Sequence, residues 1–125
     1  MNIKELGIPC VKLITPEIHH DSRGYFLETF NLKNLGSCLN SGSFLQDNET
    51  YSEYGVLRGI HYQKPPYAQS KLIRVIQAEV FDVIVDLRSD SPTYGKHLEI
   101  ILSGDNKKML YVPRGFAHGF LVMSE

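Results

Sequence analysis

The chain is poor in cysteine and lacks long apolar runs. Only two cysteines occur among its 125 residues, and they have neither CxxC spacing nor the density of a disulfide scaffold. We therefore expect Cys10 and Cys38 to be free thiols of a protein in the reducing cytoplasm. No apolar stretch approaches the roughly 20 residues that a membrane span needs. Lys4 and Glu5 interrupt the segment where a signal peptide would have its apolar core.

The chain also has almost no excess of charge of either sign. Its formal net charge is −1, which excludes general nucleic-acid binding, because that function requires a strong basic excess. A local basic site for a small anion is compatible with this balance. Hydrophobic residues make up 42% and charged residues 22% of the chain, which is typical of a soluble globular protein. The length predicts a single domain that spans residues 1–125.

Short strand patterns dominate the sequence, and we find no internal repeat. Helical periodicity is limited to residues 31–35, where Asn31 is a candidate N-cap and Gly36 a candidate C′ residue. Residues 19–24, HHDSRG, have the composition of a turn. Many short strands at short spacing predict an all-β sandwich or barrel. The expected strands are residues 10–15, 25–30, 79–87, 97–102, 108–113 and 119–123, together with both ends of the stretch 55–75.

The strand at residues 79–87 has one apolar face and one mixed face. Alternate residues of a strand point to opposite sides, so Asp82, Ile84 and Asp86 share the mixed face. Carboxylates in such a pattern predict a barrel with a partly polar interior. Small antiparallel barrels and jelly rolls hold ligands in interiors of this kind.

Two of the five histidines are candidates for chemistry. His61 and His118 lie in glycine-flanked apolar strands, LRGIHYQ and VPRGFAHGF, whereas His19, His20 and His97 are expected to be exposed. Jelly-roll metal sites typically use a His-x-His pair, because residues two apart on a strand point the same way. Position 63 is a glutamine, so we expect no metal at this site.

The stretch from Gly55 to Val75 is better suited to proton transfer and anion binding. Histidine exchanges a proton near neutral pH, and Lys71 could stabilise an oxyanion such as an enolate. Arg58, with Arg23 and Arg74, could bind a phosphate. In a regular strand Arg58 and His61 would face opposite sides. A β-bulge at Gly59 would bring them to the same side.

Several separated motifs resemble one known family. They are DSRGYFLETF, FLQDNETYSEYGVLRGIHYQKPPYAQSKLIRVIQAEVFDVIVDLR, SPTYGK and VPRGFAHGF. Together they resemble the dTDP-4-dehydrorhamnose 3,5-epimerase family, and the resemblance runs almost from Met1 to Glu125. It implies a cupin-type jelly roll that uses no metal or cofactor. It also implies epimerisation of a dTDP-linked 4-keto-6-deoxy sugar in the biosynthesis of dTDP-L-rhamnose for cell-surface polysaccharide.

The resemblance assigns roles to matching positions. It implies that His61 is the base that removes the proton beside the keto group and that Lys71 stabilises the enolate oxygen. The implied substrate-binding residues are Arg58 for the diphosphate, His118 near the sugar, the segment Gln46, Asp47 and Asn48, and Arg23 and Glu28, which reach the nucleotide from the partner subunit of a homodimer. We expect strands within residues 1–30 to pair with that partner, because they have no obvious neighbour in a minimal barrel.

Members of the family continue beyond the position that matches Glu125. The resemblance places a proton-donating tyrosine and a base-orienting aspartate in that later part. Tyr111 does not match this tyrosine. Two alternatives to the 3,5-epimerase remain open: a cupin that binds a nucleotide sugar without full turnover, and a related dTDP-sugar 3-epimerase or ketoisomerase. Neither a membrane nor a nucleic acid is an expected partner.

Overall fold

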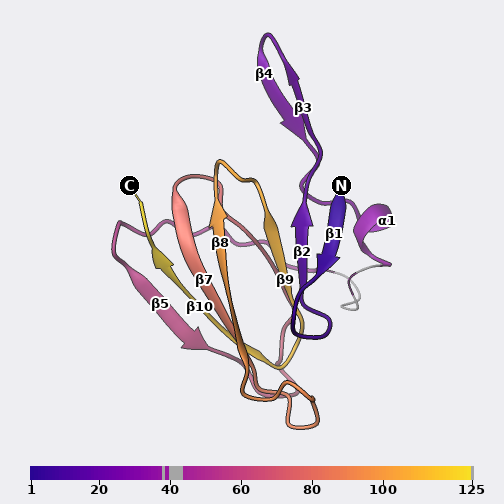
Figure 1. Ribbon diagram of the computed structural model, residues 1–125, viewed down its shortest axis with the longest axis vertical. Helices are drawn as coiled ribbons and strands as arrows, with labels where there is room; N and C mark the ends of the chain where they lie inside the picture. Colours follow the sequence, from indigo (N-terminus) through magenta and orange to yellow (C-terminus); the bar gives the residue numbers. More distant parts are fainter. Residues whose placement is uncertain (38, 40–43, 125) are drawn as a thin grey trace.

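The computed structural model describes residues 1–37, 39 and 44–124, so the prediction of a free thiol at Cys38 lies outside the described residues. Two four-stranded antiparallel sheets face each other, and a separate hairpin projects away from them (Figure 1). The first sheet has the order β1 (Asn2–Glu5), β2 (Lys12–Thr15), β9 (Met109–Val112) and β6 (Lys71–Arg74). The second has the order β5 (Leu57–His61), β10 (Phe116–Val122), β7 (Glu79–Asp86) and β8 (His97–Ser103). The hairpin consists of β3 (Ile18–Asp21) and β4 (Gly24–Leu27), and one short helix, α1 (Leu32–Leu35), follows it. This architecture confirms the predicted cupin-like jelly roll.

Apolar side chains form two clusters, one on each face of the first sheet. The cluster between the two sheets draws on both of them: Ile8, Val11, Ile84, Leu102, Leu110, Val112 and Phe116. The cluster on the outer face packs around α1: Ile14, Leu35, Leu39, Met109 and Tyr111. The first sheet is therefore covered on both faces. Its inner face, together with the inner face of the second sheet, encloses the barrel interior.

Helix α1 confirms the predicted helix at residues 31–35, with one difference at its end. The side chain of Asn31 accepts a hydrogen bond from the backbone N–H of Lys33, as an N-cap residue does. Gly36 closes the helix by donating its backbone N–H to the carbonyl of Leu32. Its φ of −58° is right-handed, so it does not adopt the left-handed C′ conformation that the sequence predicts.

The N-terminal third differs from the turn expected at residues 19–24 and from the lack of neighbours expected for its strands, while pairing of residues 1–30 with a partner subunit stays a prediction. His19 and His20 lie in strand β3, paired with Phe26 and Tyr25, and only Ser22 and Arg23 form the turn. Strands β1 and β2 do have neighbours in the barrel, since β1 pairs with β2 and β2 pairs with β9. The hairpin β3–β4 remains a two-stranded unit. The described part of the chain contains no helix that is long and apolar enough to cross a membrane.

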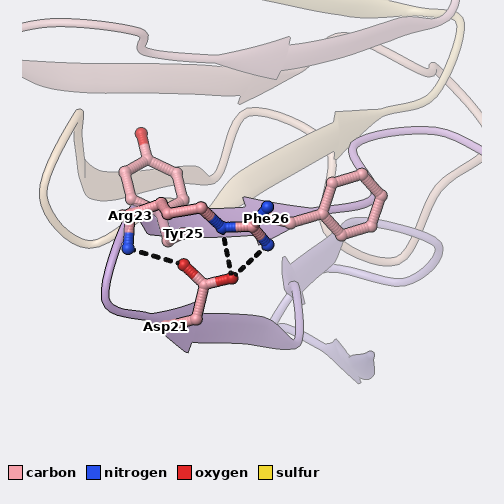
Figure 2. A pocket seen from close by; sticks show the side chains of 5 residues that line it. Asp21, Arg23, Tyr25 and Phe26 are labelled. Carbon is pink, nitrogen blue, oxygen red and sulfur yellow. Dashed lines mark hydrogen bonds and ion pairs between the residues drawn. The ribbon is translucent and has the colours of Figure 1, made fainter.

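The tip of the hairpin carries a shallow depression beside an ion pair (Figure 2). Arg23 donates its backbone N–H and two guanidinium N–H groups to the carboxylate of Asp21, at 2.8, 3.2 and 2.6 Å. Hydrogen bonds from Arg23 hold the pKa of Asp21 below its usual range. Tyr25 and Phe26 complete the lining, and both rings are exposed. The tip therefore combines a charged group with two exposed aromatic rings.

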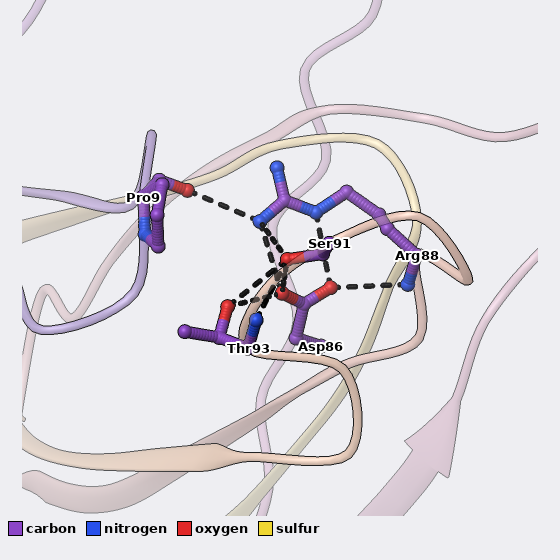
Figure 3. Close-up of polar contacts among 5 residues, drawn as sticks. All are labelled: Pro9, Asp86, Arg88, Ser91 and Thr93. Carbon is purple, nitrogen blue, oxygen red and sulfur yellow. Dashed lines mark hydrogen bonds and ion pairs between the residues drawn. The ribbon is translucent and has the colours of Figure 1, made fainter.

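Strand β7 confirms the partly polar interior that its sequence pattern predicts. Asp82, Ile84 and Asp86 are each 0% exposed, while the residues between them are only half-buried. Asp86 accepts hydrogen bonds from Ser91, from Thr93 and from both the backbone and the guanidinium of Arg88 (Figure 3). Burial alone would raise the pKa of Asp86, but these donors outweigh it and hold that pKa far below its usual range.

This carboxylate organises the loop after β7. Arg88 also donates to the carbonyl oxygen of Pro9 at 3.3 Å and lies 4.8 Å from the ring centre of Phe116. The cluster thereby joins the β7–β8 connection to the N-terminal segment and to the start of β10. Asp86 is fully engaged in holding the fold together.

Candidate active site

The candidate site is built across three neighbouring strands, with β10 in the middle. His118 of β10 pairs with His61 of β5 on one side and with Ile84 of β7 on the other. Phe120, two residues along, pairs with Arg58 and with Asp82. Because His118 and Phe120 lie on the same face of β10, their partners lie on that face too. The sheet thus brings Arg58, His61 and Asp82 together around His118.

A β-bulge in β5 makes this arrangement possible. Three steps of β5, from Arg58 to His61, lie opposite two steps of β10, from Phe120 to His118. Gly59 has a φ of +114°, and a Cβ atom there would lie 2.6 Å from the Cα of Gly119. Only glycine allows this close approach of two backbones. The structure therefore confirms that a bulge at Gly59 brings Arg58 and His61 to the same face.

Lys71 approaches the same region from the opposite sheet. It pairs with Val112, and Ile73 pairs with Leu110, and both partners belong to the interior cluster. Lys71 is therefore on the inner face of β6 and is half-buried. Arg74 is exposed and lies on the outer face, so the structure does not place it with the other candidate cations. Tyr111 likewise packs in the outer cluster around α1 and not in the interior.

Asp82 joins this group, although sequence reasoning did not single it out as a site residue. Its Oδ2 atom lies 2.9 Å from Nε2 of His118, and both side chains are buried. Burial raises the pKa of Asp82, and the hydrogen bond and charge of His118 and the charge of Lys71 oppose that effect. The signal that could have identified Asp82 is its place on the mixed face of the strand at residues 79–87.

The environment lowers the pKa values of the two groups that would carry out the chemistry. Partial burial of the ring lowers the pKa of His61 most, although the residue as a whole is exposed, and the electrostatic effects of Lys71 and His118 add to it. Burial also lowers the pKa of Lys71, and the charge of Asp82 opposes this. The rings of His61 and His118 meet edge to face, with 6.0 Å between their centres. The lowered pKa of His61 favours its neutral, proton-accepting form, and Lys71 on the facing sheet offers an ammonium that can stabilise the resulting oxyanion.

The other predicted binding residues lie on exposed segments. Arg58 donates Nε–H to Ser52 Oγ at 2.8 Å, and Gln46 donates its amide to Asn48 at 3.2 Å. Asp47 lies between Gln46 and Asn48, and all three residues are exposed. The carboxylate of Glu28 accepts from Asn31 and Asn34, both at 3.0 Å. Arg23 is at the hairpin tip, bound to Asp21.

The remaining histidines are exposed, as the sequence predicts. His19 lies 4.0 Å from Glu17, and His97 lies 3.2 Å from Glu99 at the start of β8. Within residues 1–37, 39 and 44–124, no three His, Cys, Asp or Glu side chains are grouped closely enough to hold a metal ion.

Comparison with known proteins identifies the family. A family model described as dTDP-4-dehydrorhamnose 3,5-epimerase matches residues 5–125. The chain is 48% identical to the dTDP-4-dehydrorhamnose 3,5-epimerase of Shigella flexneri, over all of this chain and 70% of the relative. The crystal structure of the Elizabethkingia anophelis NUHP1 enzyme of that name matches with a TM-score of 0.94 and 45% identity, covering 100% of this chain and 69% of the other.

A further match is a crystal structure of a dTDP-6-deoxy-D-glucose-3,5-epimerase from Legionella pneumophila Philadelphia 1, in complex with dTDP-4-keto-L-rhamnose. It has a TM-score of 0.93 and 47% identity, and the match covers 98% of this chain and 65% of the other. These similarities extend over the strands that carry His61, Lys71, Asp82 and His118. This chain therefore belongs to the dTDP-4-dehydrorhamnose 3,5-epimerase family.

Proposed function

We propose that this protein epimerises a dTDP-linked 4-keto-6-deoxy sugar at the two carbons beside the keto group, as a step of dTDP-L-rhamnose biosynthesis. The observation that carries the proposal is the inner-face group of His61, Lys71 and His118, with Arg58 on the same side. The Legionella relative is described in complex with dTDP-4-keto-L-rhamnose, which supports a sugar of this class as the substrate.

The proposed chemistry is proton transfer between the substrate, His61 and water. His61 takes the proton from a carbon beside the carbonyl, and the electrons of that C–H bond form a C=C bond. The carbonyl oxygen becomes an enolate, which the ammonium of Lys71 stabilises. A proton delivered from water to the other face of the same carbon restores the ketone with inverted configuration, and the proton on His61 passes to the solvent. No electrons are gained or lost, so the reaction needs no redox cofactor.

Substrate binding in the proposal divides between two regions. Arg58 binds the diphosphate, His118 contacts the sugar, and the segment Gln46, Asp47 and Asn48 contacts the substrate near them. Arg23 and Glu28 act on the nucleotide bound by the partner subunit of a homodimer. The position of Arg23 supports this, because it lies at the tip of a hairpin that projects away from its own barrel (Figure 1). A cytoplasmic location completes the proposal, supported by the free thiol of Cys10.

Hydrogen exchange at carbon tests the proposed function directly. The protein is incubated with dTDP-4-keto-6-deoxyglucose in D₂O, and deuterium at the two carbons beside the keto group is followed by NMR. Uptake at both positions is expected, and His61→Asn should abolish it because the amide is not a base. His97→Asn is the matched control, since His97 is an exposed histidine outside the site.

Three outcomes would contradict parts of this proposal. Exchange that persists in His61→Asn would show that another group is the base. Exchange at only one carbon would favour a 3-epimerase. Binding of dTDP with no exchange by the unsubstituted protein would favour a nucleotide-sugar-binding protein without turnover.

A further inference from the structure

We infer that Asp82 is a positioning residue for the proposed reaction, whose carboxylate fixes the ring of His118 and presents a negative charge to Lys71 on the facing sheet without pairing with it. The inference rests on the proposed function, because it assigns Asp82 a part in organising that same site. Asp82 acts through other residues, since it is 0% exposed and its Oδ2 atom contacts Nε2 of His118.

The contact with His118 fixes which ring nitrogen carries the proton. Oδ2 of Asp82 lies 2.9 Å from Nε2 of His118, and a carboxylate can only accept a hydrogen bond. A neutral His118 ring therefore carries its hydrogen on Nε2, which leaves Nδ1 as the free acceptor. The ring meets that of His61 edge to face at 71°, so the orientation of His118 also shapes the surroundings of the base.

The second oxygen of Asp82 makes no hydrogen bond to a described residue, and the charge of Lys71 acts on this carboxylate. Oδ1 is buried and has no hydrogen-bond partner among the described residues. An unpaired buried carboxylate oxygen is costly, so its presence requires a compensating charge nearby. Lys71, on the facing sheet, supplies that charge, and its interaction with Asp82 acts through space. The ammonium hydrogens consequently remain available for the oxygen of an enolate.

Asp86 provides a comparison within the same strand. It lies on the same face of β7, four residues further along, and is equally buried. Both of its oxygens accept hydrogen bonds, from Arg88, Ser91 and Thr93. One buried carboxylate is therefore fully satisfied and holds a loop in place. The other keeps one oxygen unsatisfied next to a half-buried lysine, which a purely structural role does not explain.

Asp82→Asn separates these roles because it keeps the size of the side chain and removes its charge. We expect the rate of carbon-bound hydrogen exchange to fall at least tenfold, with dTDP affinity changed less than twofold. The alkaline limb of the rate–pH profile should move to lower pH, because Lys71 loses the negative charge that raises its pKa. Asp86→Asn is the control: it should lower the melting temperature and leave the alkaline limb in place.

Two NMR measurements make the test independent of turnover. The titration of Lys71, labelled by ¹³C-methylation, should move to lower pH in Asp82→Asn. Nitrogen-15 spectra of the unsubstituted protein should show His118 with its hydrogen on Nε2, and this holds even where Asp82→Asn fails to fold. Finding the hydrogen of His118 on Nδ1 would overturn the inference. So would an Asp82→Asn protein in which both the titration of Lys71 and the exchange rate are unchanged.

The same experiment distinguishes this inference from the proposed function. An unsubstituted protein that shows no exchange overturns the proposed function. The tautomer of His118 and the titration of Lys71 then still decide whether Asp82 acts on these two residues. Exchange in the unsubstituted protein that Asp82→Asn retains in full overturns the inference alone.

Discussion

Arg58 and Lys71, the two candidate cations of the site, differ in their exposure to solvent. Arg58 is exposed and fixed by one hydrogen bond to Ser52, whereas Lys71 is half-buried on the inner face. A guanidinium keeps its charge at any physiological pH and can bind phosphate oxygens in pairs. An ammonium in a partly apolar place is less well hydrated and interacts more strongly with a new negative charge. The difference is consistent with the proposed roles, in which Arg58 binds the permanently charged diphosphate and Lys71 stabilises the transient charge of an enolate.

Removing the guanidinium of Arg58 should weaken nucleotide binding. A charge-assisted hydrogen bond contributes about 1.5–3 kcal/mol, so Arg58→Ala should weaken the binding of dTDP about tenfold or more, measured by calorimetry. Arg74→Ala is the matched control, because Arg74 is also an exposed strand arginine but lies on the outer face. EDTA should not change the affinity for dTDP of either the unsubstituted protein or Arg58→Ala. Equal affinities of Arg58→Ala and the unsubstituted protein would remove Arg58 from the site.

The sequence indicated most of the candidate residues but not their mutual geometry. His61 and His118 stood out because glycine and apolar neighbours surround them. Their edge-to-face contact depends on the register of β5 on β10, and residues 57 positions apart in sequence give no direct sign of it. Asp82 was visible only as one carboxylate of a mixed strand face. Its difference from Asp86 arises from hydrogen-bond partners that folding supplies.

At the level of secondary-structure elements, β5 determines the geometry of the site. It is an edge strand of the second sheet, and all five of its residues are exposed. The bulge places Arg58 and His61 on the same face. An anion-binding residue and a base therefore come from the same short strand, which explains why the stretch from Gly55 to Val75 is so rich in polar groups.

Gly59→Ala should disrupt this strand more than other glycine substitutions do. The new Cβ would meet the Cα of Gly119 and the carbonyl oxygen of His118, at 2.6 and 2.8 Å. Strain in this backbone region alone costs about 1–3 kcal/mol, and the steric clash adds to it. We expect a clear loss of stability in urea unfolding, together with loss of carbon-bound hydrogen exchange.

Gly55→Ala is the control for backbone strain without a clash. Gly55 has a φ of +79°, and no atom would lie within 4 Å of its new Cβ. Its substitution should lower stability by about 1 kcal/mol and preserve exchange. Equal effects of the two substitutions would show that the close approach of Gly59 to Gly119 is unimportant.

Strands with strong alternation were predictable, and short ones were less so. The periodicity of residues 79–87 and 97–102 led directly to β7 and β8. Strand β3 was missed because HHDS has the polar composition of a turn, and cross-strand pairing with β4 overrides that local preference. The pairing of β2 with β9 links residues nearly one hundred positions apart, a contact that local sequence patterns do not encode.

At the scale of the whole molecule, the hairpin β3–β4 projects from the barrel and touches it where Nζ of Lys107 lies 4.8 Å from the ring centre of Tyr25. Tyr25 is 55% and Phe26 70% exposed on it, beside the ion pair of Arg23 and Asp21. An exposed two-stranded ribbon with aromatic side chains is marginally stable by itself and gains from contact with another surface. This supports the proposed homodimer, in which the hairpin reaches the partner subunit.

Light scattering should give twice the mass of the 14.2 kDa chain at micromolar concentration. Phe26→Asp should shift this equilibrium towards the monomer, because it places a charge in the proposed apolar contact. Tyr94→Asp, at an exposed aromatic residue in the β7–β8 connection, should leave the dimer intact. A stable monomer of the unsubstituted protein at this concentration would contradict the proposal.

The backbone contact between β5 and β10 also limits how the protein can be redesigned. Random mutagenesis aimed at accepting other sugars gains nothing at codons 59 and 119, since any side chain there separates the two strands. Phe120 is a better target: its ring lies 6.2 Å from that of His118, and its backbone pairs normally with β7. A library at this position would change the surroundings of His118 and leave the strand register untouched.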